Sequence, residues 1–165
     1  MTLRTAALAL LTAAALVGCD TVVDAPAPST APATVPWTEM LDAVNAVRAE
    51  GAQCGGQLYP AAGPLAWNGR LELAALAHTV DMLENDHFAH TGTDGSEPGD
   101  RAWRAGYQWR VVGENIARYQ SSVERVVEDW MASPSHCRQI MDPTYVEMGA
   151  AEQGRYWTQV FGLPR

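Results

Sequence analysis

The stretch Tyr145–Phe161, with the sequence YVEMGAAEQGRYWTQVF, decides the fold of this chain. It contains two strand-like runs, Tyr145–Ala151 and Arg155–Phe161, separated by Glu152-Gln153-Gly154, which has the composition of a turn. Two such runs joined by so short a connection pair with each other. The stretch therefore predicts an antiparallel hairpin at the C-terminal end.

The segments before the hairpin are mostly helical by their spacing. Apolar residues three and four apart predict helices over 37–50, over 71–83 and from 121 to about Pro134. In the second of these, the apolar stripe consists of Leu76, Val80 and Leu83. A short helix is expected over 100–105, and a third strand over 110–117. Helices followed by a terminal hairpin predict an α+β layered domain.

Composition excludes several classes of protein. The 165 residues are 47% hydrophobic and 18% charged, with 11 basic residues against 19 acidic ones and a formal net charge of −8. Such values are those of a soluble globular protein rather than a long disordered chain or a multi-pass membrane protein. Nucleic acid is not expected as a partner, because its binding requires a basic face.

The first 36 residues are not expected to belong to the folded domain. Residues 1–18 carry one charge, Arg4, and then an apolar run, which predicts a secretory signal peptide. Leu16-Val17-Gly18-Cys19 resembles the bacterial lipobox, in which the cysteine is lipidated and becomes the new N-terminus. The alternative is an ordinary signal peptide with a cysteine near its cleavage site. Residues 19–36, with several prolines, are typical of an extended tether that holds a domain over 37–165 near the membrane.

Cysteine usage predicts one disulfide. Lipidation would consume Cys19 and leave Cys54 and Cys137 as a pair in an oxidising compartment. The alternative is that both are free buried thiols, which behave as small hydrophobic residues.

Four histidines and one glutamate are candidates for chemistry. His78 lies within the predicted second helix and is expected to be a satisfied or partly exposed helical residue. His87 and His90 are three residues apart, which by itself is weak support for a metal site. Glu114 sits in an otherwise apolar strand and needs a partner, since burial of an unpaired charge is costly. His136 immediately precedes Cys137.

Five segments together resemble the CAP superfamily, which comprises cysteine-rich secretory proteins, antigen 5 and plant pathogenesis-related 1 proteins, and in particular its bacterial secreted, SCP-like branch. The resemblance extends from Trp37 to Gly162 and implies a three-layer α-β-α sandwich with the C-terminal hairpin. The segments, in family order, are Pro64–Asn68, His90–Gly92 with Asp94-Gly95, Gly113–Ala117, Trp130–His136 and Tyr156–Gly162.

The resemblance also implies a cleft lined by two histidines and two glutamates. By motif, these positions correspond to His90, Glu114 and His136, whereas Ser133 stands where the second glutamate is expected. Two imidazoles, one carboxylate and an open position would suit a Zn²⁺ bound in the cleft, with His90 and His136 as its histidine ligands. The alternative is a structural hydrogen-bond network around Glu114.

Three functions are compatible with these residues. The first is a non-catalytic, lipid-anchored, extracytoplasmic binding module of the bacterial envelope, whose cleft takes a lipid or another small ligand. This interpretation is favoured because no activated nucleophile is found and Ser133 replaces a carboxylate. The second is a Zn²⁺-dependent hydrolase acting on peptides or envelope polymers, with Glu114 as the general base. The third is a structural envelope scaffold.

Overall fold

The computed structural model describes residues 37–165. The predicted signal peptide, Cys19 and the tether lie outside the described residues. The elements, in chain order, are α1 (Trp37–Glu50), β1 (Ala52–Cys54), β2 (Gln57–Tyr59), β3 (Ala66–Trp67), α2 (Gly69–Glu84), α3 (Pro98–Arg104), β4 (Trp109–Arg118), α4 (Val123–Ala132), α5 (Pro134–Met141), β5 (Glu147–Gln153) and β6 (Tyr156–Pro164). The predicted α+β class is confirmed. Over residues 37–165, every helix is too short or too polar to cross a lipid bilayer.

The centre of the domain is a four-stranded sheet with the strand order β3-β5-β6-β4. The predicted hairpin is confirmed, since β5 and β6 pair antiparallel with Gln153 opposite Tyr156. Strand β4 pairs antiparallel with β6 along nearly its whole length, and the short β3 pairs parallel with β5. The C-terminal hairpin therefore occupies the middle of the sheet.

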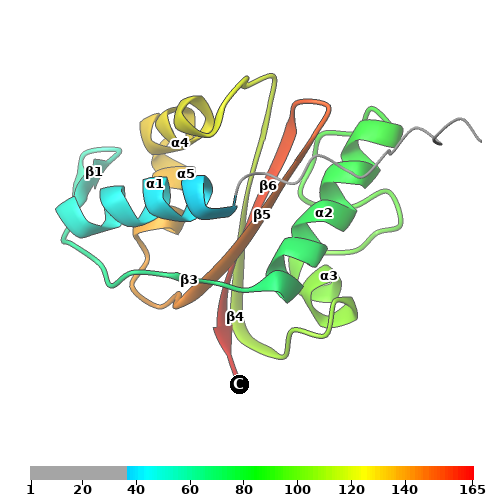
Figure 1. Cartoon of the computed structure of the whole chain (residues 1–165), viewed down its shortest axis with the longest axis horizontal. Coiled ribbons are helices and arrows are strands. Elements are labelled where there is room, and N and C mark those ends of the chain that lie inside the picture. The colour runs from blue at the N-terminus through cyan, green and yellow to red at the C-terminus, as the bar shows by residue number, and fades with distance from the viewer. Residues whose placement is uncertain (1–36) are drawn as a thin grey trace, which may run out of the picture. The chain divides into compact units, whose positions relative to one another are not determined.

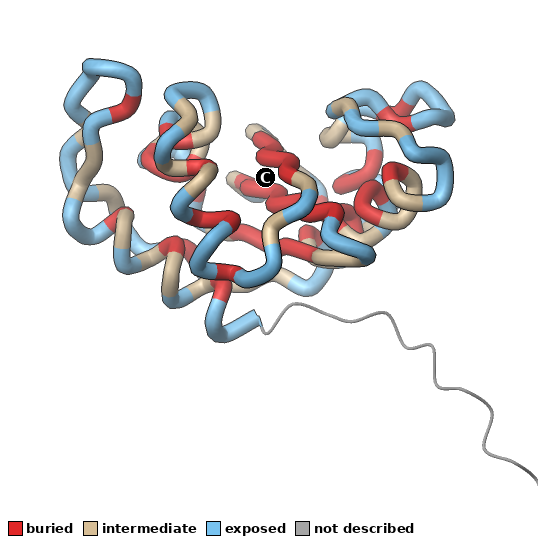
Figure 2. The backbone as a smooth tube through the Cα atoms, turned by 90° about the horizontal axis from the view of Figure 1, so that it is seen from above, coloured by how far each residue is buried: buried red, intermediate tan, exposed pale blue. Residues whose placement is uncertain are grey.

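Helices cover both faces of this sheet, as Figure 1 shows, with α1, α4 and α5 on one face and α2 and α3 on the other. The first face encloses the larger apolar core, which includes Met40, Trp130, Ile140 and Phe161. The second face encloses a smaller core built around Leu71 and Tyr107. Figure 2 shows the buried residues concentrated where the helices meet the sheet. The three-layer sandwich is confirmed.

Helix α2 packs on the sheet through small residues. Its buried stripe consists of Leu71, Ala74, Ala75, His78, Thr79 and Met82, whereas the predicted stripe of Leu76, Val80 and Leu83 is only half buried. At the contact, a side chain on Gly149 of β5 would collide with the backbone of α2 at Leu71 and Glu72. Helix and strand therefore approach closely there, and the small residues Ala74 and Ala75 lie in the buried stripe beside Leu71.

The segment between β4 and β5 differs from its prediction. The N-cap of α4 is Ser122, whose Oγ accepts a hydrogen bond from the backbone N–H of Arg125 (3.2 Å), so the helix begins at Val123 rather than at the predicted residue 121. Helix α4 ends at Ala132, and Pro134 starts the separate helix α5. Proline suits this position because the first turn of a helix needs no donor from it.

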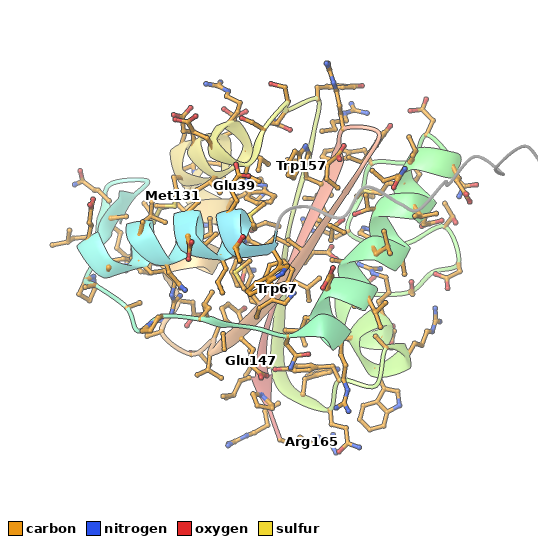
Figure 3. The ribbon with its side chains drawn as sticks, viewed as in Figure 1. Glu39, Trp67, Met131, Glu147, Trp157 and Arg165 are labelled. Atoms are coloured by element: carbon orange, nitrogen blue, oxygen red, sulfur yellow. A yellow bond between two sulfur atoms is a disulfide. The ribbon has the colours of Figure 1, made fainter. Side chains whose placement is uncertain are left out.

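Two contacts tie peripheral segments to the sandwich. The predicted disulfide between Cys54 and Cys137 is confirmed and joins β1 to α5 across 83 residues. Trp157, labelled in Figure 3, lies on β6, and its Nε1 donates a hydrogen bond to the carbonyl of Gln120 (3.1 Å). These contacts fix α5 and the loop before α4, which both contribute to the site described next.

Candidate functional site

A groove of about 510 Å³ lies between the α2–α3 loop and helices α4 and α5. Its lining comes from four places in the chain, and the residues are Phe88, Ala89, His90, Ile116, Ala117, Arg118, Gln120, Asp129, Trp130, Ser133 and His136. The volume is typical of a small-molecule site, for which the range is roughly 300–1,000 Å³. Two of the three residues predicted for the cleft, His90 and His136, therefore line one groove.

The third residue, Glu114, lies directly behind His90. Strand β4 is buried on both faces from Gly113 to Ala117, and Glu114 is 5% exposed. Its Oε1 accepts a hydrogen bond from His90 Nδ1 at 2.9 Å, and its Oε2 accepts from Arg101 Nη2 at 2.8 Å. The charge of Glu114 is therefore paired, and both of its oxygens are in use.

This pairing determines how His90 presents its ring. Because Nδ1 donates to the carboxylate, Nε2 is the ring nitrogen that remains for a partner in the groove. Arg101 also holds the backbone at this point, since its Nη2 donates to the carbonyl of His90 at 2.9 Å. The half-exposed imidazole is thus oriented by a buried ion pair.

His78 is a member of this cluster that the sequence analysis did not predict. It is fully buried on α2, its Nε2 lies 2.9 Å from the carbonyl of Ala89, and the same nitrogen lies 3.7 Å from Glu114 Oε1. Burial lowers the pKa of His78, with Glu114 acting more weakly in the opposite direction. His78 therefore supports the loop carrying His90 as a neutral donor.

The signal that identifies His78 is its register on the helix. It lies three residues after Ala75 and four before Met82, on the side of α2 that faces the sheet. The residues of the predicted stripe, Leu76, Val80 and Leu83, lie on another side of the helix. Arg101, the other residue that the sequence does not reveal, lies in the short helix α3, where no apolar period marks it as buried.

His136 reaches the groove from the first turns of α5. Burial lowers its pKa, and the proximity of His90 lowers it further. The backbone carbonyl of His136 accepts a hydrogen bond from Asn115 Nδ2 at 3.3 Å. His136 is therefore held on β4 through its backbone, in surroundings that favour the neutral imidazole.

Ser133 lines the groove, and its Oγ lies 3.3 Å from Ser135 Oγ. The groove nevertheless contains a carboxylate on α4, that of Asp129, four residues before Ser133 and hence on the same side of the helix. Asp129 accepts from Gln120 Nε2 at 2.9 Å and from Arg125 Nη2 at 2.8 Å. Glu128, the neighbouring carboxylate on α4, is exposed and does not line the groove; it also pairs with Arg125.

The remaining histidine, His87, does not line the groove, and its Nε2 lies 2.9 Å from the carbonyl of Thr91. Between residues 37 and 165, no three side chains of histidine, cysteine, aspartate or glutamate lie close enough to hold one metal ion. The groove offers a metal two imidazoles, one fewer than the three protein ligands of most catalytic zinc sites. Glu114, with both oxygens engaged, is a partner of His90 rather than a base facing the groove.

The architecture and the residue pattern agree with comparisons to known proteins. The sequence profile of the cysteine-rich secretory protein family, CAP, matches residues 41–161. The chain therefore belongs to the CAP family.

Two relatives come from Bacillus subtilis. The protein YkwD is 35% identical over 100 residues, which are 59% of this chain and 39% of YkwD. The membrane protein YlbC is 29% identical over 97 residues, which are 59% of this chain and 28% of YlbC. The matched region thus spans well under half of either relative.

Solved structures share the fold. An extracellular SCP-domain protein from Bacillus anthracis superposes with a TM-score of 0.68 and 24% identity, over 76% of this chain and 39% of that one. An outer surface protein from Borrelia burgdorferi superposes with a TM-score of 0.63 and 19% identity, over 81% of this chain and 99% of that one. At these identities the likeness establishes the fold alone.

Proposed function

We propose that this chain is a non-catalytic binding module, tethered to the bacterial envelope outside the cytoplasm, whose groove takes a small ligand. The observation that carries the proposal is the buried Glu114–Arg101 pair behind His90, which orients one imidazole nitrogen toward a groove that also contains His136. Preorganisation of this kind lowers the entropy lost when a ligand binds.

The lining of the groove supports ligand binding over a purely structural role. Phe88, Ile116 and Trp130 provide an apolar wall, while His90 and His136 provide polar groups. Small-molecule sites usually combine mostly apolar walls with a few placed polar groups. A purely structural role requires the pairing of buried Glu114 but does not require His90, whose ring is half exposed, to line a groove together with His136.

The location is supported by independent observations. The N-terminal sequence has the pattern of a lipoprotein signal followed by a proline-rich tether. Among proteins of the same fold, the one from Bacillus anthracis is described as extracellular and the one from Borrelia burgdorferi as an outer surface protein. The disulfide between Cys54 and Cys137 is also of the kind found in exported proteins.

Native mass spectrometry tests the proposed function. The full chain is incubated with a small-molecule extract of bacterial envelopes, exchanged into volatile buffer and weighed without denaturation. We expect the wild-type chain to retain a non-covalent adduct that His90→Ala/His136→Ala loses. His87→Gln is the matched control, because that imidazole lies in the same loop but outside the groove. Equal adducts on all three chains, or none on the wild type, would contradict the proposal.

A Zn²⁺ site at His90 and His136 is the second candidate. It is favoured by the contact between Glu114 and His90 Nδ1, because metal-binding histidines commonly donate their second nitrogen to a carboxylate. Bound there, the metal would act as a Lewis acid with its other positions open. Imidazoles bind metal when deprotonated, so Zn²⁺ affinity should fall on acidification. Calorimetry with ZnCl₂ tests this, and the absence of saturable heat at neutral pH would contradict it.

A further inference from the structure

Arg118 lines the groove but takes no part in the contacts around Glu114 and Asp129. It is the last residue of β4, and it lines the groove beside Phe88 and Ala117. Its guanidinium carbon lies 4.7 Å from the ring centroid of Phe88 and 5.0 Å from that of Tyr119. The guanidinium group of Arg118 thus lies over two aromatic rings, a cation–π arrangement that uses none of its N–H groups as hydrogen-bond donors.

The charge of Arg118 is not neutralised by any carboxylate that the structure describes, since none lies within 4 Å of the guanidinium nitrogens. Arg118 interacts with the hydroxyl of Tyr156, which donates its own hydrogen bond to Asp86 Oδ1 at 3.0 Å. Asp129, which lines the groove, is engaged by Arg125, and Glu114, behind His90, is engaged by Arg101. The groove thus keeps a positive charge in a chain whose formal net charge is −8.

The backbone beside Arg118 is held in an unusual conformation. Tyr119 has a φ of 82°, in the left-handed region that bulky residues rarely occupy. Its N–H donates to the carbonyl of Arg155 at 2.7 Å, which keeps the segment in place. This conformation puts the exposed Tyr119 ring over the guanidinium group. Strain of this kind is common in ligand clamps.

We propose that the groove selects a small carboxylic acid with an apolar or aromatic body. Its carboxylate pairs with the edge of the Arg118 guanidinium, and its body lies along Ile116 and Trp130. The planar guanidinium group matches the two oxygens of a carboxylate. The proposal rests on the proposed function, to which it adds the chemical class of the ligand.

Calorimetry with a charged probe and its neutral analogue tests this inference. The full chain is titrated with 4-phenylbutyrate and with 4-phenylbutyramide, which have the same apolar body and differ in charge. We expect the carboxylate to bind and the amide to bind at least about tenfold more weakly, because charge-assisted hydrogen bonds contribute about that much. Arg118→Gln should weaken carboxylate binding about tenfold and leave amide binding unchanged.

Two further variants make the test specific. Arg110→Gln removes the same charge from the exposed, opposite end of β4 and should bind like the wild type. Arg118→Lys keeps the positive charge but lacks the planar guanidinium group, and its affinity for 4-phenylbutyrate should lie between those of the wild type and Arg118→Gln. Thermal unfolding of each variant establishes that it is folded.

The outcomes separate this inference from the proposed function. Equal affinity for carboxylate and amide, equal loss in the Arg118 and Arg110 variants, or no binding of 4-phenylbutyrate would overturn the selection of a carboxylate. The proposed function would survive each of those results if the wild-type chain still retained an envelope molecule that His90→Ala/His136→Ala lost. The absence of any such molecule would overturn the proposed function itself.

Discussion

Glu114 is the residue on which the geometry of the site depends. A carboxylate on a residue that is 5% exposed must be paired, and here it is paired with Arg101 on one oxygen and His90 on the other. An apolar strand that carries a carboxylate predicts a partner, and the sequence indicates this much. The family resemblance places His90 in the same cleft as Glu114, whereas Arg101 comes from a segment that shows no pattern pointing to β4.

Buried His78 gives the domain a stability that depends on pH. Burial lowers the pKa of His78 in the folded state, so the unfolded chain binds more protons at mildly acidic pH. The stabilisation is complete above the unfolded pKa of about 6.5 and is lost as the pH falls below it. We expect the free energy of unfolding in urea to decrease from pH 7 to pH 5.

His136, whose pKa is also lowered, contributes in the same direction. His78→Gln should therefore reduce the pH dependence without abolishing it, whereas His87→Gln should retain it. The slope for one proton is at most about 1.4 kcal/mol per pH unit. A free energy of unfolding that rises on acidification, or equal slopes for His78→Gln and the wild type, would contradict this explanation.

At the scale of elements, long periodic segments could be predicted and short ones could not. Helix α1 begins and ends where its spacing and Gly51 indicate. The β5–β6 hairpin exists as predicted, but β5 continues to Gln153, so the turn consists of Gly154 and Arg155 instead of Glu152–Gly154. Strand β3 has only two residues. The N–H of Ala66 donates to the carbonyl of Val146 and that of Asn68, just after the strand, donates to the carbonyl of Met148, so β3 exists because β5 is there. No local pattern marks a segment of that kind.

Helix α5 could not be predicted for a related reason. A proline usually ends a helix, but it is equally suited to the first position of the next one. The break at Ser133 turns α5 away from α4 and brings His136 into the groove. Asp129 is not predicted either, because the family pattern places its carboxylate at position 133, one helical turn further on.

The disulfide between Cys54 and Cys137 holds α5 against β1. Closing a loop of 83 residues restricts the unfolded chain, and in the chain-entropy model this stabilises the folded state by about 4 kcal/mol. Cys54→Ala/Cys137→Ala should lower the free energy of unfolding by about 2–4 kcal/mol, as measured by urea denaturation without reductant. The control is the wild type in dithiothreitol, whose free energy of unfolding should fall by a similar amount. An unchanged unfolding midpoint in both would be incompatible with this role.

At the scale of the whole molecule, the chain combines an acidic, two-faced sandwich with an N-terminal segment of different composition. The fold class, the disulfide and the approach of His90 and His136 could be derived from sequence pattern together with family resemblance. The resemblance also implies a cleft at His90 and His136, but its volume and its other lining residues could not be predicted, because they depend on how α4, α5 and the α2–α3 loop pack around β4. The role of Arg118 could not be predicted either, because it depends on the rings of Phe88 and Tyr119, which flank its guanidinium group only in the folded chain.

The anchoring of the molecule is tested at Cys19. If the lipobox-like sequence is processed, cells expressing the full chain should incorporate labelled palmitate into it and release it from membranes only with detergent. Cys19→Ser should accumulate as a larger, unlabelled precursor. The matched control, Cys54→Ala/Cys137→Ala, keeps Cys19 and should be labelled normally. Undiminished labelling of Cys19→Ser would show that another residue carries the lipid.

The central claim is that ligands bind in the groove between His90 and His136. The chain has four histidines, so long-range ¹H–¹⁵N correlation spectra resolve every imidazole. During titration with a small-molecule extract of bacterial envelopes, we expect saturable shifts of the His90 and His136 ring nitrogens and none of His87. Unchanged His90 and His136 signals at saturation, or shifts confined to His87, would contradict the claim.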